Sequence, residues 1–184
     1  MRFIIFLLLI ISIPSYIFAQ DTLIDRDNTY FLKYSGSINL AYDYGIYSFY
    51  LPGFGVDREK FEIVNGVKLN SYMSIGIGSG MHYYFDFDKK DVWLPIFVNM
   101  KITFMKNKIS PFISLSSGYS FDLKNKFNNI GFLVNSFLGI KYRMWNKFSL
   151  ATGMGFEMQK VKVFLWDKPA YLNAMTFNIS LWFN

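Results

Sequence analysis

The stretch that decides the fold spans residues 73–84 and has the sequence MSIGIGSGMHYY. Its odd-numbered positions are mostly apolar, whereas glycine, serine and His82 occupy most of the even-numbered ones. Successive side chains of a β-strand point to opposite faces, so a period of two predicts a strand and a period of 3.6 would predict a helix. Residues 73–84 are therefore predicted to form a strand with one apolar face and one small or polar face.

The same alternation recurs along the rest of the chain. It is clear in residues 94–104, 132–143 and 175–183, and weaker in residues 33–43, 60–70, 110–121 and 147–159. With the first stretch, this makes eight predicted strands, an even number of the kind that closed single-chain barrels have. The chain of 184 residues is 52% hydrophobic, 21% aromatic and 17% charged, which excludes a disordered protein. After residue 19 no uncharged apolar run reaches the ~20 residues of a spanning helix.

The connections between the predicted strands alternate in length. Short turns follow the second, fourth and sixth strands, at residues 70–71, 106–108 and 145–147. Longer polar segments follow the others, at residues 45–60, 86–91, 122–129 and 160–169. Short turns at one rim and long loops at the other are typical of outer-membrane barrels. The sequence thus predicts an all-β fold, an eight-stranded antiparallel up-and-down transmembrane β-barrel, over residues 31–184.

The polar face of the strands indicates which side points outward. Seven ionisable side chains share this face: Glu62, Lys68, His82, Lys101, Lys141, Arg143 and Glu157. A water-exposed surface carries more charge than this, and a cation on a lipid-facing wall costs roughly 2–4 kcal/mol. We therefore expect the apolar face to meet lipid and the seven side chains to pair inside a narrow lumen. The alternative is a soluble lipid-carrying barrel, whose apolar face would point inward.

Aromatic residues at the strand ends predict two membrane interfaces. At the short-turn rim they are Tyr72, Phe104, Tyr142, Trp145 and Phe148, and at the long-loop rim they are Tyr83, Trp93, Tyr119 and Phe156. Pro95 interrupts this pattern because it cannot donate an amide to the strand ladder. We expect it at a bulge or near the long-loop rim.

The first 19 residues have the features of a secretory signal peptide. Arg2 precedes an apolar segment, and cleavage is predicted between Ala19 and Gln20. Residues 20–30 then form an N-terminal extension ahead of the barrel. The chain has no cysteine, which excludes disulfides, thiolate metal sites and cysteine nucleophiles. The expected location is the cell outer membrane.

The sequence offers little for cofactors or metals. Glycines 76, 78 and 80 have the spacing of neither phosphate-binding fingerprint. The single histidine, His82, cannot form a histidine metal site. Three loop carboxylates could hold calcium, but the lysines between them favour a solvated loop: Asp86, Asp88 and Asp91. We expect no cofactor, no metal and no nucleic-acid partner.

Lysines in two neighbouring long loops suggest a lipid partner. They are Lys124, Lys126, Lys160, Lys162 and Lys168. Such point charges could attract lipopolysaccharide phosphates, and the alternative is that they only keep the loops soluble. Outer-membrane lipid and lipopolysaccharide are therefore the expected partners.

Four segments resemble the small outer-membrane β-barrel family that includes the OmpA-like and OmpX-like eight-stranded domains. These segments are residues 63–70, 75–80, 94–97 and 110–115, and the resemblance extends over the chain after the signal peptide. The last strand is similar to the signal that such proteins present to the barrel-assembly machinery, through Phe177, Ile179, Leu181 and Phe183. It departs from the usual form because Asn184 follows Phe183. The resemblance implies the assembly machinery as a partner, and a peptidoglycan-tethering role is not expected.

The predicted function is a non-enzymatic outer-membrane protein with a structural or surface-interaction role and a lumen plugged by polar side chains. One alternative is an enzyme acting on lipid or peptide at the outer rim, with His82, Asp86 or Asp88, and a nearby serine. Another is a narrow channel gated by rearranging ion pairs.

Overall fold

The computed structural model describes residues 33–46, 53–85, 91–124, 127–145, 147–161 and 170–183. The predicted signal peptide and its cleavage site at Ala19 and Gln20 lie outside these residues. The strands are β1 (Lys33–Gly45), β2 (Gly53–Phe54), β3 (Arg58–Lys68), β4 (Met73–Tyr84), β5 (Asp91–Thr103), β6 (Ile109–Asp122), β7 (Asn128–Arg143), β8 (Phe148–Val161) and β9 (Ala170–Phe183). Within the described residues, no helix is long and apolar enough to cross a membrane.

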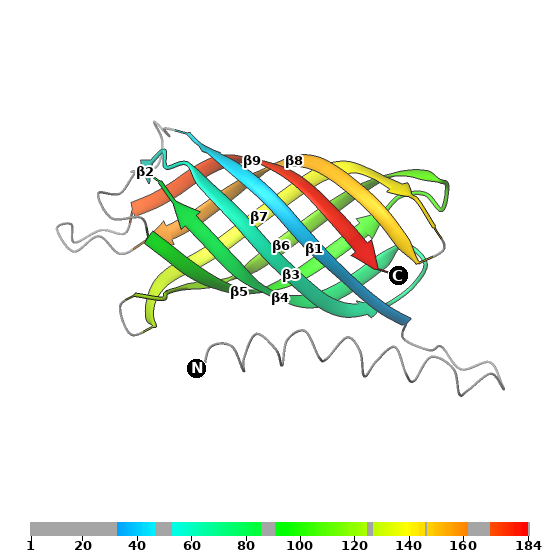
Figure 1. Ribbon diagram of the computed structural model, residues 1–184, viewed down its shortest axis with the longest axis horizontal. Helices are drawn as coiled ribbons and strands as arrows, with labels where there is room; N and C mark the ends of the chain where they lie inside the picture. The colour runs from blue at the N-terminus through cyan, green and yellow to red at the C-terminus, as the bar shows by residue number, and fades with distance from the viewer. Residues whose placement is uncertain are drawn as a thin grey trace.

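The eight long strands form a closed antiparallel barrel. Each pairs with the next along the chain, and β1 pairs with β9 to close the sheet, as the adjacent blue and red arrows of Figure 1 show. The predicted eight-stranded up-and-down barrel is confirmed. The sequence did not predict β2, whose two residues are too few for a period of two to be visible. It pairs in parallel with Tyr171 and Leu172 of β9, at the end of the barrel opposite the carboxyl terminus (Figure 1).

The tight turns lie at one rim, between β3 and β4, β5 and β6, and β7 and β8. The first of them is built by Asn70, whose side-chain oxygen accepts the backbone N–H groups of Tyr72 and Met73 at 2.8 Å each. This is the local bonding for which asparagine is favoured in turns. We call this end of the barrel the short-turn rim, and the opposite end the long-loop rim.

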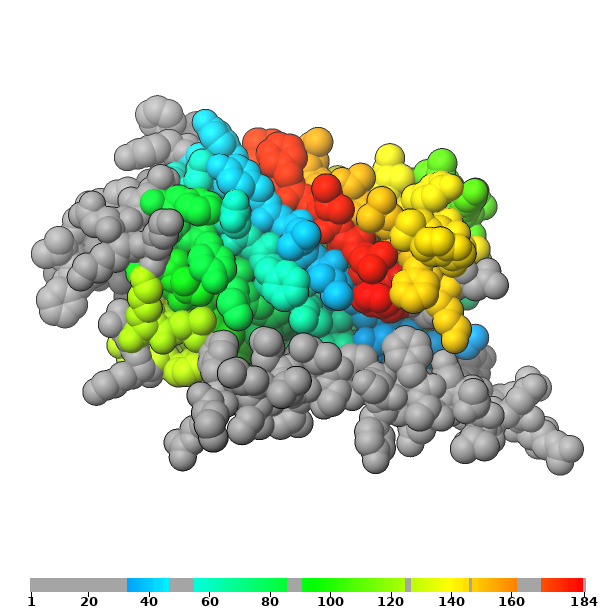
Figure 2. Space-filling model, in the orientation of Figure 1, coloured from blue at the N-terminus to red at the C-terminus, as the bar shows by residue number. Residues whose placement is uncertain are grey.

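The apolar face of the strands forms the outer wall. Ile77 is 66% exposed and Leu138 is 60% exposed, whereas Asn99 and Asn135, on the other face of their strands, are buried. Figure 2 shows one side of this wall, where side chains of β1 and β9 lie next to each other. The expected outward orientation of the apolar residues is thus confirmed. The soluble alternative is wrong because it requires these side chains to point inward.

Eight of the nine predicted belt aromatics lie exposed on the barrel exterior or its turns, and Trp93 does not. Trp93 is only 5% exposed because it shares the strand face of Phe97 and Asn99, which points into the lumen. On β7, Tyr142 belongs to the short-turn belt, and Phe132 lies at the long-loop belt because its ring packs against that of Tyr119. The strand between Phe132 and Tyr142 spans about 25 Å at a rise of ~3.3 Å per residue and a tilt of ~40°, which matches the apolar band of a membrane barrel.

Pro95 lies in β5 near the long-loop rim, as predicted. It pairs with Ser120 of β6, while the ladder to β4 is interrupted between the pairs Ser79–Ile96 and His82–Trp93. The missing amide of Pro95 therefore falls where no ladder bond is made. Beside it, the pairing of β6 with β7 shifts register after Ser120.

Candidate functional site

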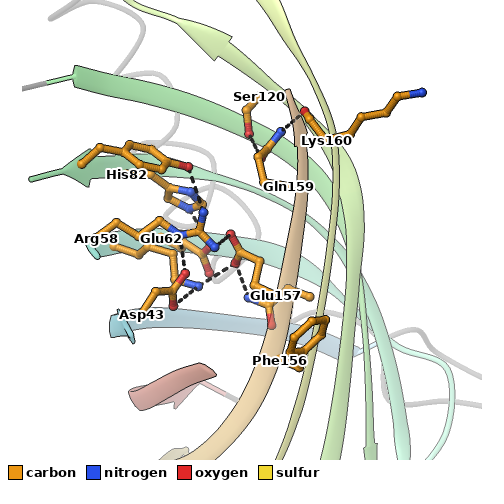
Figure 3. A network of polar contacts seen from close by, with 12 residues as sticks. Asp43, Arg58, Glu62, His82, Ser120, Phe156, Glu157, Gln159 and Lys160 are labelled. Atoms are coloured by element: carbon orange, nitrogen blue, oxygen red, sulfur yellow. Dashed lines mark hydrogen bonds and ion pairs between the residues drawn. The ribbon is translucent and has the colours of Figure 1, made fainter. Parts of the chain in front are cut away.

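Four charged side chains meet in the long-loop half of the lumen, and we call them the charge cluster: Asp43, Arg58, Lys60 and Glu157. Figure 3 labels three of them, Asp43, Arg58 and Glu157. Lys60 Nζ lies 2.7 Å from Asp43 Oδ1 and 2.6 Å from Glu157 Oε2. Arg58 pairs through Nε with Asp43 and through Nη2 with Glu157 Oε1, the latter at 2.8 Å. All four side chains are fully buried. The cluster is a closed ring of ion pairs in which two cations balance two carboxylates.

Strand register and barrel closure together build this ring. Arg58 and Lys60 are two positions apart on β3, so both point into the lumen, and Asp43 stands opposite Arg58 on β1. Glu157 lies on β8, which is separated from β3 by β9 and β1. Its carboxylate reaches the two cations across the interior. An eight-stranded barrel is narrow enough for such contacts between side chains of non-adjacent strands.

Further polar side chains surround the charge cluster. Asn135 donates through Nδ2 to Glu157 Oε2 at 2.6 Å, and Arg58 donates through Nη1 to the Tyr84 hydroxyl at 3.2 Å. His82 Nε2 lies 3.0 Å from Glu62 Oε1, and both side chains are buried. Buried charges are stable only when they are paired and hydrogen-bonded, so these neighbours complete the cluster.

An apolar cap closes the lumen beyond the charge cluster, at the long-loop rim. It consists of Val56, Tyr84, Trp93, Val161, Ala170 and Leu172, all buried. The rings of Tyr84 and Trp93 are tilted against each other, with centroids 4.0 Å apart. The cap separates the charge cluster from solvent, and this lowers the local dielectric constant and strengthens the ion pairs.

Aromatic rings and a hydrogen-bonded asparagine side chain fill the middle of the lumen. Asn99 donates through Nδ2 to the hydroxyl oxygens of Ser114 and Ser116, at 2.8 and 2.9 Å. A void of about 20 Å³ remains beside these residues, enough for a single water. The lumen glycine Gly78 makes room here for an aromatic ring. A Cβ at Gly78 would lie 2.3 Å from the ring of Phe97.

The short-turn half of the lumen holds cations around Trp182. Lys101 Nζ donates to Ser37 Oγ at 2.5 Å and lies 4.7 Å from the Trp182 ring centroid. Lys141 Nζ lies 5.6 Å from the same centroid, on the side of the lumen that opens to the short-turn rim. Within the described ranges no carboxylate forms an ion pair with either lysine. Cation–π contacts thus take the place of ion pairs in this half.

The structure divides the seven predicted lumen residues into three places. Glu62, His82 and Glu157 lie in and beside the charge cluster, and Lys101 and Lys141 lie against Trp182. The remaining two, Lys68 and Arg143, lie at the short-turn rim, where Lys68 is half-buried and Arg143 exposed. The sequence predicts one network of seven side chains. In the structure they are divided between the charge cluster and its surroundings, the Trp182 contacts, and two separate cations at the short-turn rim.

Sequence reasoning missed Asp43, Arg58 and Lys60, which carry most of the ion pairing. The sequence pattern predicts Arg58 in a long loop and Lys60 at the boundary between that loop and the next strand. In the structure, β3 already begins at Arg58. The signal that could have found them is parity, because Lys60 stands two positions before Glu62 and Arg58 stands four positions before it. Asp43 likewise shares the polar face of β1 with Asn39.

The other predicted sites are only partly within the described residues. Lys124 is exposed and lies 3.4 Å from Asp91, and Lys160 is exposed on β8. The remaining loop residues lie outside the described ranges: Asp86, Asp88, Lys126, Lys162 and Lys168. The assembly-signal residues Phe177 and Ile179 are exposed on the outer wall, and Leu181 and Phe183 are half-buried. Among the described residues, no three metal-ligating side chains gather as a metal site would need.

Comparison with known proteins shows the fold. No family model matches the sequence, and no curated protein does. Among solved structures, Neisserial surface protein A is similar with a TM-score of 0.64 and 10% identity, over 82% of this chain and 96% of that one. The outer membrane enzyme PagL is similar with a TM-score of 0.52 and 13% identity, over 78% of this chain and 97% of that one. These likenesses show the fold alone, which is the closed eight-stranded transmembrane β-barrel that these two outer-membrane proteins also have.

Proposed function

We propose that this chain is a non-enzymatic outer-membrane barrel, exported through a cleaved signal peptide, whose lumen is closed by its own side chains. Its role is structural or surface-interacting, with the long loops presented outside the cell. The observation that carries the proposal is the combination of an apolar outer wall with a capped and fully paired charge cluster inside. The likeness to Neisserial surface protein A is in keeping with it, as a likeness of fold.

Fractionation with electrophoresis tests the location. We expect the protein in the outer-membrane fraction and, without heating, a faster-migrating folded form that heating converts to the unfolded one. A protein released into the periplasm without detergent would contradict the proposal.

Conductance separates a closed plug from a gated channel. The central void of about 20 Å³ has room for a single water, and the buried apolar cap lies at the long-loop rim, so both support a closed lumen. We therefore expect no stepwise conductance when the purified barrel is added to a planar bilayer. Steps that appear in the wild type and change in Glu157→Gln would instead support gating by the ion pairs.

The enzyme alternative depends on His82. Its ring is fully buried in the lumen and lies 3.0 Å from Glu62, a position that supports pairing and gives no access to substrate at the rim. The likeness to PagL, itself an outer membrane enzyme, is a likeness of fold. The test compares outer-membrane lipids from cells that make the wild type, the His82→Ala variant or neither. We expect all three lipid profiles to be the same, and a modification that only the wild type causes would contradict the proposal.

A further inference from the structure

The two ends of the barrel differ in charge. In the described ranges, all charged side chains at the short-turn rim are basic: Lys33, Lys68, Lys106, Lys108, Lys141, Arg143 and Lys147. The long-loop end carries both signs, as in the contact of Lys124 with Asp91. Apart from Lys141, which contacts Trp182 in the lumen, these rim residues have no part in the lumen contacts described above, and their single sign requires an explanation of its own.

Two of these lysines are held on the outer wall and not over the lumen. Lys106 Nζ lies 5.0 Å from the ring centroid of Tyr72, and Lys108 Nζ lies 5.2 Å from that of Tyr142. Both tyrosines belong to the aromatic belt, with exposed fractions of 47% and 41%. The Arg143 guanidinium donates to the Lys106 carbonyl at 2.7 Å and so braces the turn that carries both lysines.

This geometry leaves the ammonium groups available to an anion. A cation–π contact orients an ammonium over a ring, while its N–H donors stay free to bond elsewhere. No carboxylate in the described part of the chain forms an ion pair with Lys106, Lys108 or Lys147. Lys147 is exposed next to Phe148, whose ring packs edge-on against Trp145. Three lysines thus stand in the belt that lies at the level of lipid headgroups.

We propose that Lys106, Lys108 and Lys147 form a binding site for the phosphate groups of anionic phospholipids in the leaflet at the short-turn rim. A lysine ammonium recognises phosphate as a point charge. The position on the outer wall selects a bilayer lipid over a soluble anion that would enter from the lumen. The inference rests on the proposed function, because only a membrane-inserted barrel places this belt among headgroups.

The test measures lipid preference of the barrel refolded into phosphatidylcholine bilayers. Spin-labelled phosphatidylglycerol and phosphatidylcholine are compared by the fraction that the protein wall immobilises. One lysine near an anionic surface raises the binding constant of an anionic lipid roughly fivefold. Because most lipids around the barrel do not touch these lysines, we expect about a twofold average preference for phosphatidylglycerol over phosphatidylcholine. The preference should vanish in 1 M salt, where the Debye length is about 3 Å.

Matched variants locate the site. Lys106→Gln, Lys108→Gln and Lys147→Gln together should abolish the preference for phosphatidylglycerol. Lys124→Gln with Lys160→Gln, at the opposite rim, should preserve it. A wild-type barrel without a preference, or an equal loss in both variants, would overturn the inference, and the wild-type salt dependence tests it even if the triple variant fails to fold. A wild type that does not fold into the bilayer would instead refute the proposed function.

Discussion

Replacing Glu157 with glutamine tests the buried charge cluster directly. The substitution keeps the shape of the side chain but leaves Arg58 and Lys60 with only Asp43 as a carboxylate partner in the ring. Each of the two buried cations then loses one of its two ion-pair partners. At an effective dielectric constant of about 20, two opposite charges about 4 Å apart attract each other by about 4 kcal/mol. Removing one partner of a buried ion pair typically destabilises a protein by about 3–5 kcal/mol, which agrees with this figure. We expect the free energy of unfolding to fall by about that amount.

The assay is equilibrium urea unfolding of the barrel in phosphatidylcholine vesicles, followed by tryptophan fluorescence and by mobility without heating. Lys160→Gln is the control, because Lys160 is exposed on the same strand. It should change the free energy of unfolding by no more than about 0.5 kcal/mol. Adding Lys60→Met to Glu157→Gln should recover part of the loss, since Arg58 and Asp43 then remain as one balanced pair. If Glu157→Gln unfolds like the wild type, the cluster is hydrated and the reasoning from burial is refuted.

Three further predictions concern the outer wall and the filling of the lumen. Ile77→Lys and Leu138→Lys should each lower the free energy of unfolding by roughly 2–4 kcal/mol and reduce the yield of the folded, heat-modifiable form, because both residues are exposed on the apolar wall. The control Ser116→Ala should leave the yield of the folded form unchanged. Gly78→Leu should lower stability by more than 1 kcal/mol in urea unfolding, since even its Cβ would overlap a phenyl ring, and a wild-type midpoint would show that the lumen can repack. Lys101→Met should leave the free energy of unfolding unchanged or raise it, because it removes a buried cation that has no carboxylate in ion-pair contact. A decrease in the free energy of unfolding of more than about 2 kcal/mol would contradict this account.

The fold could be predicted from the sequence because its main signal is local. Alternation along residues 73–84 depends only on the geometry of an extended backbone, and it identified both the strand and the face on which Ile77 lies. Turn residues such as Asn70 are equally local, since their side chains bond the backbone two and three residues on. The number of long strands, the apolar wall and the two unlike rims follow from these signals alone, whereas β2 does not.

The contents of the lumen could not be predicted in the same way. Lys60 and Glu157 are 97 residues apart in sequence, and their contact depends on how far the strands shift when the sheet closes. Parity placed Glu157 inside but could not choose its partner, and the belt interpretation wrongly placed Trp93 at the membrane interface. The sequence by itself determined a membrane-type barrel with a polar interior. Only the tertiary structure decided that acids and bases pair in one half and that cations meet aromatic rings in the other, because pairing across a lumen is a property of closure and not of any single strand.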